Sequence, residues 1–172
     1  MNNATKMGFV NLSNNSNIPN KSGLTIGKMY FYFYDPKTKD QMPYYDIFPV
    51  VIPIDYMPAK RSATGRDAGF LGLNLHYIPP RYRITLLDKL YTITNNSAFN
   101  ESTKIRLSYR VLQKNASFFE ATPCLKWYLF KQVRSRVLEI DADEWEIAAL
   151  LPFESFQKQT KQRVWSDSRR KF

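Results

Sequence analysis

The chain has 172 residues, of which 44% are apolar, 15% aromatic and 23% charged, and its formal net charge is +10 at pH 7. This length suits one domain with a core of ordinary size, and the apolar share excludes a disordered chain. A single cysteine, Cys124, excludes an internal disulfide, and with a single histidine it excludes the usual Cys/His zinc sites.

The positive charge is unevenly distributed along the chain. Residues 94–140 and 158–172 carry +5 each, whereas residues 141–157 between them carry −5. A basic balance of this kind favours an anionic partner, either nucleic acid or an acidic protein surface. No apolar segment approaches the roughly 18 residues that span a membrane, so we expect no membrane partner.

The first 23 residues predict a flexible arm. Seven asparagines lie within the first 20 positions, and the arm contains no acidic residue and few large apolar ones. Such a segment cannot bury enough surface to order itself. We expect residues 24–152 to form a single α+β domain and residues 153–172 to form a basic C-terminal helix or tail.

Strands are predicted in the first half of the domain. Met29–Tyr34 carries large apolar or aromatic residues on both faces, which indicates a strand that is covered on both sides or presents tyrosines to a partner. The two prolines of Phe48–Ile54 favour an edge strand. Phe70–Tyr77 places three leucines on the core side and His76 with Asn74 on the other face. We therefore expect an N-terminal antiparallel, barrel-like sheet of about three to five strands.

A helical half with a basic C-terminal tail is predicted to follow this sheet. Pro79-Pro80 introduces a helix whose inward stripe contains Ile84, Leu87, Leu90 and Tyr91. A second helix is predicted over Ser102–Lys114. A third is predicted to open at Thr122-Pro123, with Leu125, Tyr128 and Leu129 facing inward.

The C-terminal third of the chain predicts a return to the sheet and then more helix. Arg134–Ile140 is predicted as a short returning strand. Asp141 and Glu144 resemble a capping pair for a helix that reaches Leu151. Beyond it, Phe153, Phe156 and Val164 fit a narrow helical stripe within the basic tail.

The sequence offers little for catalysis. His76 is the only histidine, and Asp67 lies ~30 Å away if the strand between them is extended, so His76 is interpreted as a polar residue at a strand-to-helix joint. A metal-dependent nuclease stays an alternative because it needs only carboxylates, a lysine and a divalent ion, and Asp40, Asp46 and Asp55 are available. We predict no enzyme, no catalytic residue, no metal ligand, no cofactor and no small-molecule substrate.

Basic residues next to aromatic ones give the clearest binding signal. The loop Ala59–Gly69 has the small and basic residues of a phosphate-binding loop but lacks its Gly-Lys-Ser/Thr ending, so it is predicted to be an exposed basic loop. Cationic side chains neutralise phosphates, and an indole stacks on an exposed base. The predicted DNA-binding residues are Lys60, Arg61, Arg66, Arg81, Arg83, Lys126, Trp127, Lys131, Arg134, Arg136, Arg163, Arg169 and Arg170.

Four long motifs cover most of residues 27–172: FYFYDPKTKDQMPYYDIFPVV, GFLGLNLHYIPPRYRITLLDKL, LKWYLFKQVRSRVLEIDADEWEIAALLPFESF and KQRVWSDSRRKF. On these motifs the chain resembles a family of small virion proteins of large contractile-tailed bacteriophages, labelled DNA end protectors or head completion proteins. The resemblance implies a protein that binds the ends of packaged double-stranded DNA and shields them from host exonuclease after injection. It also implies a role in head completion or head-tail joining.

The same resemblance implies other virion proteins as partners, and a location in the virion and, during assembly and after injection, in the host cytoplasm. A structural neck or baseplate adaptor with no direct DNA role remains the alternative. Residues 1–23 fall outside the resemblance, and the loop Ala59–Ala68 is longer than the family leads us to expect.

Overall fold

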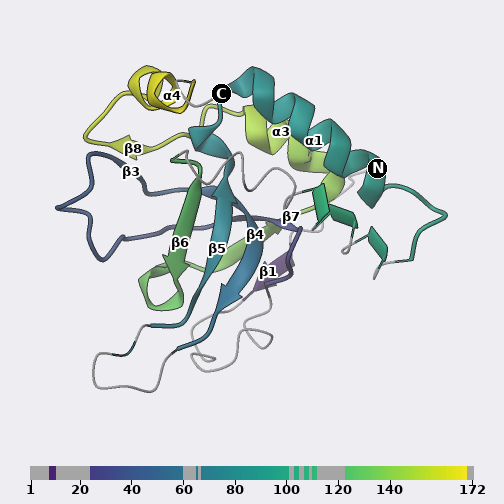
Figure 1. Cartoon of the computed structure of the whole chain (residues 1–172), viewed down its shortest axis with the longest axis horizontal. Coiled ribbons are helices and arrows are strands. Elements are labelled where there is room, and N and C mark those ends of the chain that lie inside the picture. Colours follow the sequence, from purple (N-terminus) through teal and green to yellow (C-terminus); the bar gives the residue numbers. More distant parts are fainter. Residues whose placement is uncertain are drawn as a thin grey trace, which may run out of the picture.

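The computed structural model of the chain describes residues 8–10, 24–59, 65, 67–100, 103–104, 107–108, 110–111 and 123–169. Helices gather on one side of a curved antiparallel sheet (Figure 1). The elements are β1 (Gly8–Val10), β2 (Met29–Phe31), β3 (Tyr45–Asp46), β4 (Val50–Met57), β5 (Gly69–Asn74), η2 (Leu75–Tyr77), α1 (Pro80–Thr94), β6 (Leu125–Leu129), η3 (Phe130–Gln132), β7 (Val137–Ile140), η4 (Ala142–Glu144), α3 (Trp145–Leu150), β8 (Phe156–Gln157) and α4 (Lys161–Arg169).

Within the described residues, six strands form one sheet in the order β1-β7-β2-β4-β5-β6, and every neighbouring pair is antiparallel. β3 and β8 form a separate two-stranded sheet. The α+β class and the antiparallel sheet are thus confirmed. The barrel-like shape is not, because the large sheet is open and ends at β1 on one edge and β6 on the other. β1 lies within the predicted arm, and the rest of residues 1–23 lies outside the described residues.

The two faces of the large sheet carry different cores. Met29 packs with Val50, Ile52 and Leu73 on the face that α1 and α3 cover. On the opposite face Tyr30, Tyr32 and Tyr34 join an aromatic cluster with Phe70 and Tyr128. The Tyr32 and Tyr128 rings meet edge to face with their centroids 5.8 Å apart. The prediction from the alternation of Met29–Tyr34, that both sides of this strand are covered, is therefore confirmed.

The strand predicted over Phe70–Tyr77 ends earlier than its alternation suggests. The chain leaves the extended conformation after Asn74 and forms the turn η2, which is held by the N–H of His76 donating to Oδ1 of Asn74 at 3.0 Å. This turn breaks the period of two, so His76 points into the protein. It is fully buried, and its Nδ1 lies 2.7 Å from Oδ2 of Asp46. The prediction that His76 lies on a polar outer face is wrong.

The helix predicted at Pro80 is confirmed, but its buried face is rotated from the expected one. Ile84 and Tyr91 are exposed, and the helix instead buries Arg83 beside Leu86, Leu87 and Leu90. Although it is buried, the Arg83 guanidinium has four polar partners. Nε donates to the carbonyl of Ile78 at 2.6 Å, Nη2 to that of His76 at 3.1 Å and Nη1 to that of Ala149, and Nη2 lies 2.8 Å from Glu154.

The helix predicted to open at Thr122-Pro123 is wrong. Leu125–Leu129 forms the strand β6, in register with β5 through Gly72 and Lys126. A short apolar run does not distinguish strand from helix, and here the long-range pairing decides. The returning strand is confirmed as β7. Of the helix predicted over Ser102–Lys114, residues 103–104, 107–108 and 110–111 are helical and the others lie outside the described residues.

The predicted helix up to Leu151 is confirmed as α3, which follows the turn η4. Asp141 precedes η4 without a capping hydrogen bond from its side chain, so the predicted capping pair is wrong. The stripe predicted from Phe153 onward is also wrong, because Phe156 lies in β8 and the C-terminal helix starts at Lys161. Of the helices in the described ranges, none combines the length and apolar character needed to cross a bilayer.

Close approach of β5 to its neighbours requires glycine. A Cβ at Gly69 would lie 2.1 Å from the carbonyl oxygen of Tyr128, which belongs to the backbone of β6 and cannot rotate away. We expect Gly69→Ala to lower the free energy of unfolding by about 1–3 kcal/mol, as overpacking does. Urea unfolding followed by tryptophan fluorescence measures this. Gly65→Ala, at an exposed position, is the control, and equal midpoints for the two variants would contradict the expectation.

Candidate functional site

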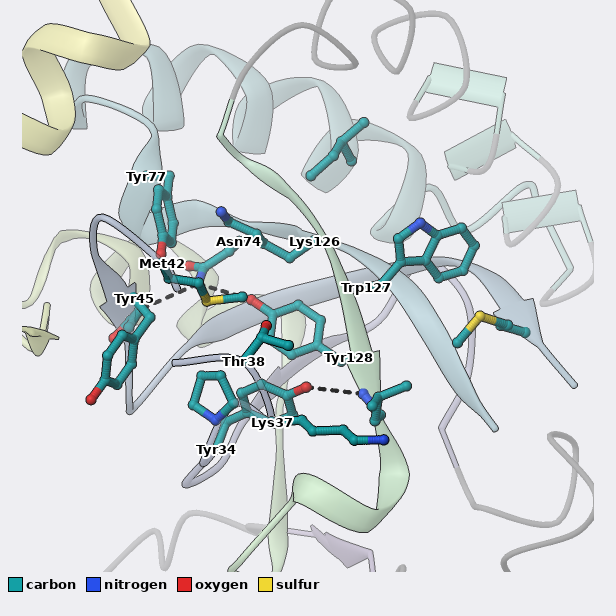
Figure 2. A pocket seen from close by; sticks show the side chains of 15 residues that line it. Tyr34, Lys37, Thr38, Met42, Tyr45, Asn74, Tyr77, Lys126, Trp127 and Tyr128 are labelled. Atoms are coloured by element: carbon teal, nitrogen blue, oxygen red, sulfur yellow. Dashed lines mark hydrogen bonds between the residues drawn. The ribbon is translucent and has the colours of Figure 1, made fainter. Parts of the chain in front are cut away.

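A groove of about 580 Å³ lies along the strand β6, at the edge of the large sheet. Three segments that are distant in sequence line it: residues 34–46, the end of β5 with η2, and β6 itself. Figure 2 shows the loop that carries Lys37 and Thr38 facing Tyr128 and Lys126, whereas Trp127 projects from the other side of β6. The pairing of β5 with β6 and the docking of the 34–46 segment therefore create this site.

The floor of the groove is a buried polar network. The side chains of Asp46 and Asn74 are buried, and Nδ2 of Asn74 donates both to Asp46 at 3.2 Å and to the hydroxyl of Tyr128 at 3.0 Å. The Asp46 carboxylate also accepts a hydrogen bond from the N–H of Phe48 at 3.2 Å. Its Oδ2 lies 2.7 Å from Nδ1 of His76. These contacts fix the Asp46 carboxylate beneath the floor, where its side chain is only 1% exposed.

One wall of the groove carries a lysine that is largely removed from water. The ammonium of Lys126 lies 4.7 Å from the centroid of the Tyr77 ring, and burial lowers its pKa. The Tyr34 hydroxyl, from the facing segment, accepts a hydrogen bond from the N–H of Leu129 at 3.1 Å. Trp127, at the edge, is 50% exposed. The wall thus combines a desolvated cation with an accessible indole, a pair that suits anions and flat rings.

Exposed cations form a rim beside the groove. Lys37 and Lys131 both approach Asp67, at 3.8 and 2.9 Å, and the hydrogen bond from Lys131 is the main cause that lowers the pKa of Asp67. Arg134 lies 4.0 Å from Asp35, which also binds Lys39. The rim, defined as Lys37, Lys39, Lys131 and Arg134, contains more cations than Asp35 and Asp67 neutralise.

Lys158 holds the outer wall of the groove from the C-terminal segment. Its ammonium donates to the carbonyl oxygens of Lys39, Asp40 and Met42 at 2.7, 3.2 and 3.1 Å. Lys158 has a φ of 70°, a backbone conformation that residues other than glycine seldom adopt. A strained residue that carries three hydrogen bonds indicates a contact that the fold maintains, so the 39–42 turn is fixed against β8.

The structure separates the predicted DNA-binding residues into groups. Lys126 and Trp127 line the groove, and Lys131 and Arg134 belong to its rim, whereas Arg136 is exposed just before β7. Arg81 is exposed in the first turn of α1, and Arg163 and Arg169 are exposed on α4. Lys60, Arg61, Arg66 and Arg170 lie outside the described residues. Arg83 must be removed from the set, because its fully buried guanidinium pairs with Glu154 and cannot reach a surface ligand.

Sequence reasoning missed the side of the groove opposite β6. Lys37, Met42, Tyr45 and Asp46 come from a segment that the sequence marks only as a turn after an aromatic strand. The alternating tyrosines of residues 30–34 were the available signal for this side of the groove. More tyrosines than one core can bury indicate a second aromatic surface. Nothing local in the sequence indicates which segment faces them.

The aspartates considered for a nuclease, Asp40, Asp46 and Asp55, do not share one site in the described part of the chain. Asp46 is buried under His76, whereas Asp55 is exposed and accepts from the N–H of Tyr56. Within the described ranges, no three His, Cys, Asp or Glu side chains are placed to share a metal ion. One acid-x-lysine triplet, Asp35-Pro36-Lys37, occurs in the sequence, and its lysine starts a turn rather than lying on a strand.

The edge strand of this α+β domain thus borders a groove lined by aromatic rings and lysines. The family model described as phage T4 terminal DNA protecting protein matches residues 9–168, so the chain belongs to this family. Neither the curated proteins nor the solved structures contain a match to the chain.

Proposed function

We propose that the protein binds the ends of linear double-stranded DNA in the virion and shields them without catalysing a reaction on them. The observation that carries the proposal is the groove, where Lys126, Trp127 and Tyr45 combine a cation with accessible rings beside a basic rim. Strand ends offer what this chemistry binds, namely phosphates next to bases that leave the stack easily. Membership in a terminal DNA protecting family supports ends rather than internal duplex.

The ends of packaged DNA lie where a head is closed, so we further propose that the protein assists head completion or head-tail joining from this position. Its locations are then the virion and, during assembly and after injection, the host cytoplasm. The exposed arginines Arg81, Arg163 and Arg169 extend the basic surface beyond the groove and provide further phosphate contacts.

Competition between two forms of the same DNA tests end binding. Labelled linear duplex is bound to the full chain at several salt concentrations and challenged with unlabelled linear DNA or with the same sequence as a closed circle. We expect the linear competitor to displace the label at a lower concentration and the affinity to fall steeply with salt. Equal displacement by both competitors contradicts end binding. The DNA is expected to stay intact in magnesium and in manganese, and cleavage in either metal favours the nuclease alternative.

The lowered pKa of Lys126 predicts a distinctive pH dependence of binding. Because burial lowers this pKa from its ordinary value of 10.5, the ammonium loses its proton as the pH rises through a range where exposed lysines are still charged. Its attraction for phosphate is present below that range and lost above it. We expect the Kd ratio of wild type to Lys126→Arg to rise as the pH approaches 10.5 from below, since arginine stays protonated. A constant ratio contradicts the expectation.

A second surface favours an additional role as a structural adaptor. A groove of about 260 Å³ between β7, β2 and α3 is lined mainly by apolar residues. At its border Ile147 and Phe153 are 63% and 51% exposed. Acidic residues lie in and around η4 and at the start of α3, namely Asp141, Asp143, Glu144 and Glu146. The apolar groove therefore has acidic side chains near it. We propose that it binds a segment of a neighbouring virion protein that presents apolar side chains between lysines or arginines.

A photo-crosslinking amino acid at position 147 tests the adaptor role in intact particles. We expect mass spectrometry to find the crosslink in a basic, apolar segment of another virion protein. Crosslinks to DNA, to a second copy of this chain or to an acidic segment each contradict the proposed occupant. The same label at Lys89, which is exposed on α1, controls for non-specific reaction.

A further inference from the structure

We infer that the groove along β6 holds an unpaired terminal nucleotide of DNA with its base directed inward and its phosphate outward. This inference rests on the proposed end binding and adds the form of the ligand. Its volume of about 580 Å³ falls within the range of small-molecule sites, roughly 300–1,000 Å³. A paired base would bring its complementary strand with it, so the site suits a nucleotide that has left the duplex.

The charge of the groove changes from its floor to its rim, and this gradient orients the ligand. Asp46 places a carboxylate at the floor, where it is held by Asn74 and His76. The Asp46 side chain is only 1% exposed and its oxygens already have partners within the protein, so it offers the ligand no hydrogen bond but disfavours a phosphate at the floor. Lys37 and Lys131 lie at the rim, where side-chain exposures of 65% and 66% leave them accessible to phosphates.

Accessible rings supply stacking surface for the base. Tyr34, Tyr77 and Tyr128 are nearly buried and form the lining, whereas Tyr45 is half-buried and Trp127 half-exposed. In Figure 2 Tyr45 and Trp127 lie on opposite sides of Lys126 and Tyr128. Stacking on such rings is tolerant of sequence, which suits a protein that must accept whatever base ends the DNA.

Lys126 links the two ends of the bound nucleotide. Its ammonium sits over Tyr77, between the floor and the rim, and burial keeps its pKa low in the free protein. A phosphate placed above the base would approach this ammonium and favour its charged form. The position of Lys126 therefore selects a nucleotide that carries a phosphate over a free base.

Hairpin-closed duplexes with one open end test the inference. Four ends are compared with the full chain: two-nucleotide overhangs of dA, dC or dT, and an overhang of two abasic nucleotides that keeps the phosphates and removes the bases. We expect overhangs with bases to bind about 5- to 150-fold more tightly than the abasic one, the range for one stacked base.

The double variant Tyr45→Ala/Trp127→Ala is expected to bind base-bearing and abasic overhangs alike. The control Tyr91→Ala removes an exposed ring outside the groove and should retain the difference. Equal binding of base-bearing and abasic ends by the wild type overturns the inference while end binding itself stands. Equal binding of linear and circular DNA instead removes the proposed function.

Discussion

Replacing Arg83 by methionine is expected to lower the free energy of unfolding by about 3–5 kcal/mol, the usual cost of removing one partner of a buried ion pair. Glu154, whose side chain is only 3% exposed, would lose its cationic partner, and its second oxygen already has no hydrogen-bond partner among the described residues. The carbonyl oxygens of Ile78, His76 and Ala149 would lose their shared donor. The guanidinium joins η2, α1 and α3, so its loss affects the whole helical layer.

Equilibrium unfolding in urea measures this effect, and Arg81→Met supplies a matched control. Arg81 lies two residues earlier in the same helix, is exposed, and should change stability by about 0.5 kcal/mol or less. The double variant Arg83→Met/Glu154→Met is expected to be more stable than Arg83→Met alone, because no unpaired charge remains buried. Similar unfolding midpoints for Arg81→Met and Arg83→Met contradict the structural role of Arg83.

Neutralising two exposed arginines, Arg134 of the rim and Arg136 two residues further along the chain, is expected to weaken DNA binding strongly. The guanidinium of Arg134 lies 4.0 Å from the carboxylate of Asp35. We expect Arg134→Gln/Arg136→Gln to bind linear DNA roughly tenfold to hundredfold more weakly at low salt, since each substitution removes a charge-assisted hydrogen bond to phosphate. The slope of log affinity against log salt should fall by about 0.9 for each phosphate that the variant no longer neutralises.

A second double variant separates direct phosphate binding from net charge. Lys89→Gln/Arg110→Gln removes the same charge from exposed helical positions away from the groove. It is expected to leave the salt slope almost unchanged. If both double variants weaken binding equally, the basic residues act through the overall field of the protein and the rim does not bind phosphate directly.

Where local pattern decides structure, prediction from sequence succeeded. The period of two in β2 and β7 and the proline start of α1 each depend on neighbouring residues. Prediction failed at β6 and at His76 for physical reasons that local pattern does not contain. β6 becomes a strand because β5 pairs with it, and His76 turns inward because the Asn74 side chain closes a turn that ends the alternation.

The groove was only half predicted for the same reason. Lys126 and Trp127 were found because cations and an aromatic ring lie next to each other in the sequence. Tyr45 and Asp46 were missed, since their segment reaches β6 only after β3 pairs with β8 and Lys158 fixes the 39–42 turn. Arg83 was included wrongly because composition does not distinguish a surface arginine from one that anchors a core.

Protection of linear duplex from an exonuclease tests end shielding most directly. Labelled linear DNA is incubated with the full chain, digested by a processive duplex exonuclease, and compared with the same DNA that carries hairpin caps on both ends. We expect the chain to preserve the open-ended DNA at about one protein per end, and Arg134→Gln/Arg136→Gln to lose this protection. Digestion at an unchanged rate with saturating protein, or protection only when protein coats the whole duplex, would contradict end binding.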